Sequence, residues 1–180
     1  MAKTPAILVA PQVWRIPLVG DFVNGFMLRD ADGQVTLIDM GIKSSGAKVM
    51  AALTSIGSGP SDVTRLVLTH AHPDHAGGAA HVARQTGKGF AIHEADAQAA
   101  SSGKSPPRDP ATRLGRLTNR LGGGGFDPVP VEETFTDGQI LPIAGGVEVI
   151  HTPGHSPGHA SFLLRESGVL ITGDAIFNVR

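Results

Sequence analysis

Residues 65–78, RLVLTHAHPDHAGG, constrain this chain more than any other stretch. An apolar run centred on residues 66–68 indicates a short buried strand that ends near Thr69. Pro73 disfavours helical geometry for the residue before it, so we expect the segment after the strand to be a loop and a helix to begin only near Ala76. Four candidate metal ligands fall within six positions of this segment: His70, His72, Asp74 and His75.

Imidazole and carboxylate groups together suit zinc, and also iron or manganese, whereas calcium prefers oxygen ligands alone. The chain has no cysteine, so thiolate ligands are excluded. Two later segments place similar groups just past strand-like runs: HTPGHSPGH at 151–159, which contains His155, and VLITGD at 169–174, which ends in Asp174. The two oxygens of an aspartate can contact two cations at once. The sequence therefore predicts a metal centre assembled from three separated segments.

With these motifs in this order, the sequence resembles the metallo-β-lactamase superfamily from about Val13 to the end, and most closely its hydroxyacylglutathione hydrolase (glyoxalase II)-like branch. The resemblance implies an α/β (α+β) fold, the αβ/βα four-layer sandwich, in which two sheets pack face to face with helices outside both. It also implies two divalent metal ions, with zinc as the expected metal and iron or manganese as alternatives.

The resemblance assigns the ligands residue by residue. Site one consists of His70, His72 and His155; Asp74 and His75 belong to site two; Asp174 bridges both. The family normally adds one further histidine to site two some tens of residues later, and this sequence ends at Arg180. We therefore expect the C-terminal part of the sandwich to be missing and the second site to be incomplete. The chain is then either an incomplete record of a longer protein or a fragment that associates with another chain, for example as a homo-oligomer.

Asp39 follows the third predicted strand, where the resemblance places an aspartate that accepts a hydrogen bond from a metal-bound histidine. The alternative is a turn aspartate that hydrogen-bonds its own backbone. Arg113, Arg116 and Arg120 recur at helical spacing, and form either a solvated helix face or a cap helix that meets an anionic substrate. The other four histidines are not assigned to metal. His81 and His93 are predicted to be ordinary surface or packing residues, whereas His151 and His159 either pack or hydrogen-bond next to the metal ligands, or contact substrate.

The composition is typical of one globular domain. With 180 residues, of which 41% are hydrophobic, residues 1–180 are predicted to form a single metallo-β-lactamase-like domain, in which the Pro- and Gly-rich residues 94–130 are a variable cover segment. A net charge of −1 provides no field for nucleic acid, and the strand-sized apolar runs predict no membrane span or signal peptide. The lack of cysteine is consistent with a reducing cytosol, so a cytoplasmic location is the default expectation.

The implied activity is metal-dependent hydrolysis of a small-molecule substrate. A zinc-bound hydroxide, available because zinc lowers the pKa of its water to roughly 7, attacks an ester, thioester or lactone carbonyl, and Asp74 relays the proton to the leaving group. Three alternatives remain open. They are a mononuclear iron persulfide dioxygenase that holds iron with His70, His155 and Asp174, a phosphodiesterase or nuclease of the same superfamily, and a truncated, non-catalytic metal-binding fragment.

Periodicity and turn residues predict the remaining elements. Strands are expected at 12–16, 22–29, 34–38 and near 89–93, and helices at about 45–56, 76–85, 94–100 and 113–120. A second sheet is expected from strands at 139–143, 146–150, 160–165 and 169–172.

Overall fold

The computed structural model describes residues 5–108, 110–120 and 124–176, and its strands form two sheets. The larger sheet has seven strands in the order β1 to β7, and the smaller has four in the order β11-β10-β9-β8. The strands of the larger sheet are β1 (Ile7–Ala10), β2 (Val13–Val19), β3 (Val23–Arg29), β4 (Val35–Ile38), β5 (Val63–Val67), β6 (Phe90–His93) and β7 (Val131–Phe135). Those of the smaller sheet are β8 (Ile140–Leu141), β9 (Val147–His151), β10 (Ala160–Leu164) and β11 (Val169–Ile171).

The larger sheet changes its pairing at β4. Strands β1 to β4 pair antiparallel, whereas β4 to β7 pair in parallel. Every residue of β4 and of β6 is buried, as expected for strands covered on both faces. Parallel strands have their carboxyl ends at one edge, so the segments that follow β4, β5 and β6 all leave from the same edge of the sheet.

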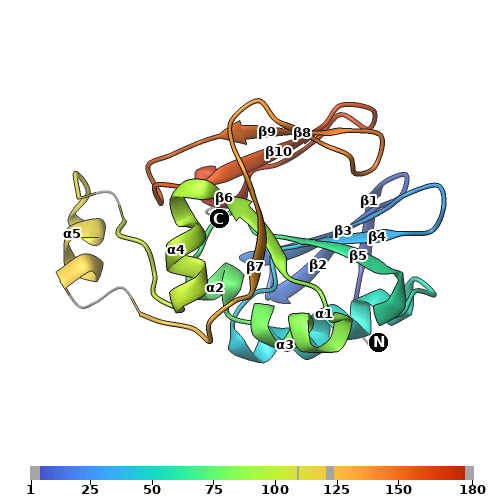
Figure 1. The fold of residues 1–180 in the computed structure, drawn as a ribbon, viewed down its shortest axis with the longest axis horizontal. Coiled ribbons are helices and arrows are strands. Elements are labelled where there is room, and N and C mark those ends of the chain that lie inside the picture. The colour runs from blue at the N-terminus through green and yellow to red at the C-terminus, as the bar shows by residue number, and fades with distance from the viewer. Residues whose placement is uncertain (1–4, 109, 121–123, 177–180) are drawn as a thin grey trace.

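Helices cover the outer face of the larger sheet, as Figure 1 shows for α1 (Gly46–Ser55) and α3 (Ala79–Thr86). Leu53 and Val82 of these helices share one buried cluster with Leu37 and Leu66 of the strands. Burying one aliphatic side chain of this size contributes roughly 1.5–3 kcal/mol, so this core holds the helices to the sheet. No helix of the described ranges combines the length and the apolar character that crossing a membrane requires. The other helical segments are η1 (Lys43–Ser45), η2 (Pro60–Asp62), α2 (Pro73–Ala76), α4 (Glu94–Ser102), α5 (Arg113–Arg120) and η3 (Gly173–Ala175).

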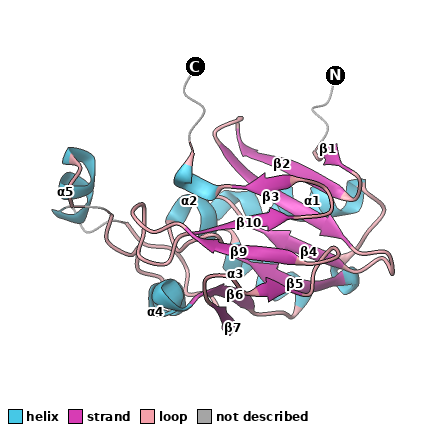
Figure 2. Ribbon diagram, turned by 90° about the horizontal axis from the view of Figure 1, so that it is seen from above, coloured by secondary structure: helices cyan, strands magenta, loops and turns pink. Residues whose placement is uncertain are grey.

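A second core fills the space between the two sheets. Val67 of the larger sheet and Val149 of the smaller one belong to it, and the rings of Phe135 and Phe162 meet edge to face with centroids 5.6 Å apart. Figure 2 shows β9 and β10 lying over the larger sheet. The described residues thus form three of the predicted layers, helices, larger sheet and smaller sheet, and the helical layer expected outside the smaller sheet is not among them.

Strand ends from both sheets meet at one edge. Strands β9 and β11 run in the same direction because each pairs antiparallel with β10. The loop at residues 152–159 and the turn η3 therefore leave the smaller sheet on the same side. The N–H of Ala160 donates to the carbonyl of Thr69 over 2.9 Å, which joins this side to the end of β5.

The main differences from the predicted elements are two additional strands, β1 and β7, and an earlier helix start. The expectation that a helix begins only near Ala76 is wrong, because α2 begins at Pro73. Proline is favoured at the first helical position, where its missing N–H is not needed. His72 before it is extended, as expected, but Asp74 and His75 lie in a helical turn rather than in a loop.

Candidate metal centre

Histidines from the two sheets converge at the shared edge. His70 and His72 lie on the segment after β5, and His155 lies on the loop between β9 and β10. The ring centroid of His70 is 4.8 Å from those of both His72 and His155, which are 4.6 Å from each other. One ligand atom from each residue lies within 4.8 Å of the other two, and His72 Nδ1 is 2.8 Å from His155 Nε2. The structure therefore brings together the three histidines predicted for site one.

Hydrogen bonds around His70 leave one of its ring nitrogens available for a metal. The Thr69 hydroxyl donates to Asp39 Oδ2 over 2.8 Å, because a carboxylate only accepts. The same hydroxyl lies 2.9 Å from His70 Nδ1, so it must accept the Nδ1 proton. His70 Nε2 then carries a lone pair, and this atom is buried with no hydrogen-bond partner among the described residues. An unpaired buried acceptor is costly, and it indicates a ligand that the described protein atoms do not supply.

The three rings are also in the charge state that metal binding requires. Burial, reinforced by the neighbouring histidines, lowers the pKa of His70 well below 6.5. Burial followed by the charge of Arg108 lowers the pKa of His72 to about 4, and burial lowers that of His155 to about 4. Neutral imidazoles bind metal without releasing a proton. A tetrahedral ion with bonds of about 2.0–2.1 Å holds its nitrogens roughly 3.3 Å apart, which small movements of these rings achieve. The residues therefore fit a metal ion.

A second group of ligand atoms shares His70 and adds His75 and Asp174, again within 4.8 Å of one another. The ring of His75 lies between two carboxylates, with Nδ1 2.7 Å from Asp39 Oδ2 and Nε2 2.9 Å from Asp174 Oδ1. Burial opposes the charged form of His75, but the two carboxylates outweigh it and raise its pKa to about 10. Without metal, His75 is thus a cation, and its Nε2 proton must leave before that nitrogen can bind a metal.

Asp174 contacts one histidine from each group. Its Oδ1 faces His75, and its Oδ2 lies 3.1 Å from His155 Nε2. Burial would raise the pKa of Asp174, but the hydrogen bond and charge of His75 outweigh burial and lower it. A carboxylate shared between two groups of ligands is the arrangement expected of the predicted bridging residue.

His159 holds Asp174 in this place and has the hydrogen-bonding role predicted as one of its alternatives. Its Nε2 accepts the backbone N–H of Asp174 over 2.9 Å, so the ring proton is on Nδ1 and is donated to the Thr152 hydroxyl over 2.8 Å. A Cβ at Gly173 would lie 2.6 Å from His159 Nε2. Any side chain at position 173 would clash with the His159 ring, so glycine is needed there for the N–H of Asp174 to reach His159.

Two other predicted site residues lie next to these groups. Asp39 is buried and accepts three hydrogen bonds, from the N–H and the hydroxyl of Thr69 and from His75. This is the arrangement expected of a residue that orients metal-binding histidines. Asp74 is half-buried in α2 and belongs to neither ligand group among the described residues, although its charge acts on His72. Its place in site two stays a prediction.

The three arginines predicted to meet substrate, Arg113, Arg116 and Arg120, lie on α5, and both views show this helix standing apart from the sheets (Figures 1 and 2). All three are exposed, and Arg116 donates to the carbonyls of Pro110 and Ala111, each over 3.0 Å. Their contact with substrate stays a prediction.

Sequence reasoning did not single out Arg108, whose positive charge acts on two histidines of the first ligand group. Its charge contributes, after burial, to the lowered pKa values of His72 and His155. Arg108 and Asn119 are joined by two backbone-to-side-chain hydrogen bonds of 2.9 and 2.8 Å, and both line a cavity of about 340 Å³ next to the residues that flank His155. No sequence periodicity marks Arg108, because it lies in the irregular segment before α5.

A second unpredicted residue is Asp96 of α4, which is fully buried and hydrogen-bonds both histidine-bearing loops. The available signal was an acidic residue in the first helical turn after β6, at the edge where β4 and β5 also end. Acidic residues are common in first helical turns for reasons of helix stability, so this signal was ambiguous.

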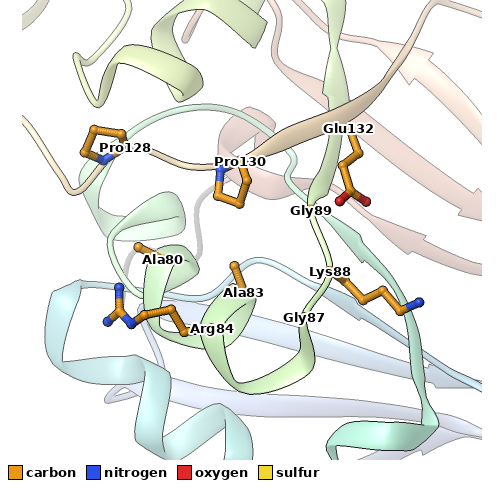
Figure 3. Close-up of a pocket in the computed structure, with 9 residues that line it drawn as sticks. All are labelled: Ala80, Ala83, Arg84, Gly87, Lys88, Gly89, Pro128, Pro130 and Glu132. Atoms are coloured by element: carbon orange, nitrogen blue, oxygen red, sulfur yellow. The ribbon is translucent and has the colours of Figure 1, made fainter.

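Another cavity, of about 330 Å³, lies away from the centre and is shown in Figure 3. Ala80 and Ala83 of α3, the turn at residues 87–89, and Pro128 and Pro130 line it, and Arg84 and Lys88 point away from each other on its two sides. It contains none of the predicted ligands.

Comparison with known proteins identifies the family. Residues 18–180 match the family model described as the metallo-beta-lactamase superfamily. The chain belongs to this superfamily. As a metallo-β-lactamase superfamily member, it is 27% identical over 165 residues to the hydroxyacylglutathione hydrolase GloC of Haemophilus influenzae, covering 90% of this chain and 70% of that protein. It is 29% identical over 133 residues to an N-acyl homoserine lactonase of Bacillus sp, covering 72% and 45%.

The superfamily fold is also found in solved structures. The metallo-β-lactamase MIM-1 of Novosphingobium pentaromativorans superposes with a TM-score of 0.74 and 30% identity, covering 88% of this chain and 54% of that one. The matches thus span 45 to 70% of the length of these three relatives. The predicted superfamily and its fold are confirmed, and the likeness to hydroxyacylglutathione hydrolases is that of a distant homologue.

Proposed function

We propose that the protein is a metal-dependent hydrolase that cleaves an ester, thioester or lactone bond in a small molecule. The observation that carries this proposal is the double ligand group: two sets of three ligand atoms share His70, and Asp174 contacts a histidine of each set. His70, the residue common to both sets, has a buried Nε2 with no hydrogen-bond partner among the described residues. Two metal ions, with zinc as the expected element, are part of the proposal.

A metal held here would supply Lewis acidity that polarises a carbonyl and lowers the pKa of bound water to roughly 7. His70, His72 and His155 would hold the first ion, and His75 with Asp174 would contribute to the second. Asp39 keeps a proton on His75 Nδ1 and, through Thr69, on His70 Nδ1, so that both rings present Nε2 to the centre.

Asp74 is proposed to carry the proton to the leaving group. It is half-buried beside the centre, and it is outside the two ligand groups that the described residues form. Its charge acts on His72, and a carboxylate next to the centre that binds no metal is a suitable group to pass a proton to a leaving oxygen or sulfur. The backbone carbonyl of Pro106, 3.3 Å from His72 Nε2, fixes the ring from the other side.

The superfamily relatives support the bond classes. Two of these relatives are named for a hydroxyacylglutathione, which is a thioester, and for an N-acyl homoserine lactone. Both reactions replace a carbonyl substituent by water through an anionic transition state, which cationic metal ions stabilise. We therefore propose acyl transfer to water as the reaction class, with a small-molecule substrate.

The proposal is tested with purified protein whose metal has been removed with a chelator and then restored with zinc, iron or manganese. We expect hydrolysis of at least one of an α-hydroxyacyl glutathione thioester, an N-acyl homoserine lactone and a simple aryl ester, only after metal is restored, and its loss in His72→Ala. Uptake of oxygen with a persulfide and one iron per chain would instead identify the dioxygenase alternative. Absence of metal binding would refute the proposal outright.

A further inference from the structure

Asp96 lies in α4, outside both ligand groups, and yet contacts the loops that carry their histidines. Asp96 is fully buried, and all three of its hydrogen-bond donors are on the two loops that carry the histidines. Its Oδ2 accepts the N–H of Ala71 over 3.1 Å and the hydroxyl of Ser156 over 2.7 Å. Its Oδ1 accepts the N–H of Gly158 over 2.7 Å.

Two of the three donors are adjacent in sequence to a histidine of the first ligand group, and the third lies on the same loop as His155. Ala71 lies between His70 and His72, on the segment after β5 of the larger sheet. Ser156 follows His155, and with Gly158 it belongs to the loop between β9 and β10 of the smaller sheet. One carboxylate therefore ties together two loops from different sheets, and the three histidines of the first ligand group are divided between these loops.

Steric fit shows that the contact between the helix and the loop is close. A Cβ built at Gly158 would lie 2.6 Å from the backbone N of Asp96 and 2.8 Å from its Cβ and Cγ. No side chain fits there without moving the loop away from α4. Glycine at 158 is therefore needed for the backbone N–H to reach the carboxylate.

The chemistry of the donors requires a carboxylate rather than an amide. A backbone N–H faces each oxygen of Asp96, from Ala71 on one side and from Gly158 on the other. An asparagine has one acceptor and one donor end, so in either orientation its NH₂ faces one of these N–H groups. Two donors facing each other in a buried place repel, and one of the two loops would be released.

We propose that Asp96 is a positioning residue that sets the separation between the His70–His72 segment and the His155 loop, and so completes the three-histidine metal site. Among the described residues Asp96 takes part in no salt bridge, so its buried charge depends on these three donors. The inference rests on the metal site of the proposed function, and it does not depend on which bond is hydrolysed.

The test compares wild type, Asp96→Asn, Ser156→Ala and the control Glu94→Gln, which removes an exposed acidic charge from the same helical turn. Each metal-free protein is titrated with zinc against a competing chelator, and the absorption spectrum of each cobalt-substituted protein is recorded. We expect Asp96→Asn to bind the first equivalent roughly 10 to 100-fold more weakly, with an altered cobalt spectrum. Ser156→Ala, which removes one donor of three, should show a smaller loss, and Glu94→Gln should match wild type.

The outcomes separate this inference from the proposed function. A folded Asp96→Asn protein with wild-type zinc affinity and cobalt spectrum would overturn the inference. If Asp96→Asn does not fold, Ser156→Ala decides, and unchanged affinity in that variant overturns the inference instead. If wild type binds zinc but hydrolyses none of the substrates, the proposed function fails while a loss of affinity in Asp96→Asn still supports the positioning role.

Discussion

Substituting Asp39 by asparagine should weaken metal binding by reversing the direction of a hydrogen-bond chain. Asp39 Oδ1 accepts the N–H of Thr69, so the amide oxygen of an asparagine must take this position and its NH₂ must replace Oδ2. The NH₂ then donates to the Thr69 hydroxyl and to His75 Nδ1. The hydroxyl proton turns toward His70 Nδ1, so the ring proton of His70 moves to Nε2. His75 loses its Nδ1 proton and keeps the one on Nε2, so in both rings the proton lies on the nitrogen that faces the metal.

The size of the effect follows from these contacts. To bind metal, each of the two rings must return its proton to Nδ1 and so place it against a donor in a buried site. Each such mismatch costs about 1–3 kcal/mol, or about 2–6 kcal/mol for the pair. The lower bound corresponds to roughly 30-fold weaker zinc binding, since 1.4 kcal/mol is a factor of ten. The backbone should tolerate asparagine, because Asp39 has φ 58° and asparagine adopts this region readily.

The measurement has two parts. Long-range proton–nitrogen NMR spectra of the metal-free protein, labelled with ¹⁵N in histidine, report which ring nitrogen carries each proton, and chelator competition reports zinc affinity. Asp39→Ala is the comparison, since it removes the acceptor without adding a donor. We expect Asp39→Asn, although isosteric, to bind zinc more weakly than Asp39→Ala. The reasoning is refuted if asparagine leaves the tautomers unchanged, or if it binds zinc better than alanine does.

Three further predictions concern the same centre. Asp174→Ala should weaken metal binding more than any other single substitution outside the segment after β5, and by well over 100-fold, because Asp174 contacts both ligand groups. Elemental analysis of the dialysed protein would show the loss of metal. Arg108→Ala should raise the KM for anionic substrates several-fold with little change in kcat, because Arg108 lines the cavity next to His155. Arg116→Ala should leave the KM unchanged, because the Arg116 guanidinium binds a carbonyl of its own segment. Equal effects of the two substitutions would contradict a role of Arg108 in substrate binding. The pKa values of His72 and His155 are about 4 in the folded protein and 6.5 in the unfolded chain, so folding favours their neutral forms. The metal-free protein should therefore keep this contribution to stability above pH 6.5 and lose it as the pH falls toward 4. Thermal unfolding between pH 7 and 4.5 tests this, and a melting temperature independent of pH would be the contrary result.

The elements that could be predicted from the sequence are those whose burial leaves a pattern. Strands such as β4 and β9, and helices such as α1, show apolar residues at the period of their structure, and glycine or proline marks their ends. The two strands that were not predicted, β1 and β7, are the two edges of the larger sheet. Three of the four residues in β1 are exposed, as are three of the five in β7, so neither has an alternating apolar face. Edge strands form through backbone pairing with a neighbour, which no local pattern reveals.

In the candidate site, too, the residues that form a local motif could be predicted from the sequence. Histidine and aspartate in dense, short motifs are rare enough to be noticed, and the structure brings together His70, His72 and His155, and also His75 with Asp174, as the motifs suggested. The helical turn at Pro73 was misjudged because proline both disfavours a helix before it and favours one after it. Only the effect on the residue before Pro73 was used in the prediction, whereas tertiary packing determines whether a helix also begins at the proline.

Asp96 shows why the remaining part of the site required a structure. Its partners are 25, 60 and 62 positions away along the chain, and they are ordinary residue types, a backbone N–H of alanine, a serine and a glycine. No motif can encode such a contact, because any residue has a backbone N–H. What makes the contact specific is that β5, β6 and β9 all end at one edge, so that a helix starting after β6 begins between the two histidine loops. Metal ligands can thus be recognised from short sequence motifs, whereas a residue that joins ligand loops from two sheets depends on the topology of the fold. Such residues should be looked for at the start of the helix that begins between the loops.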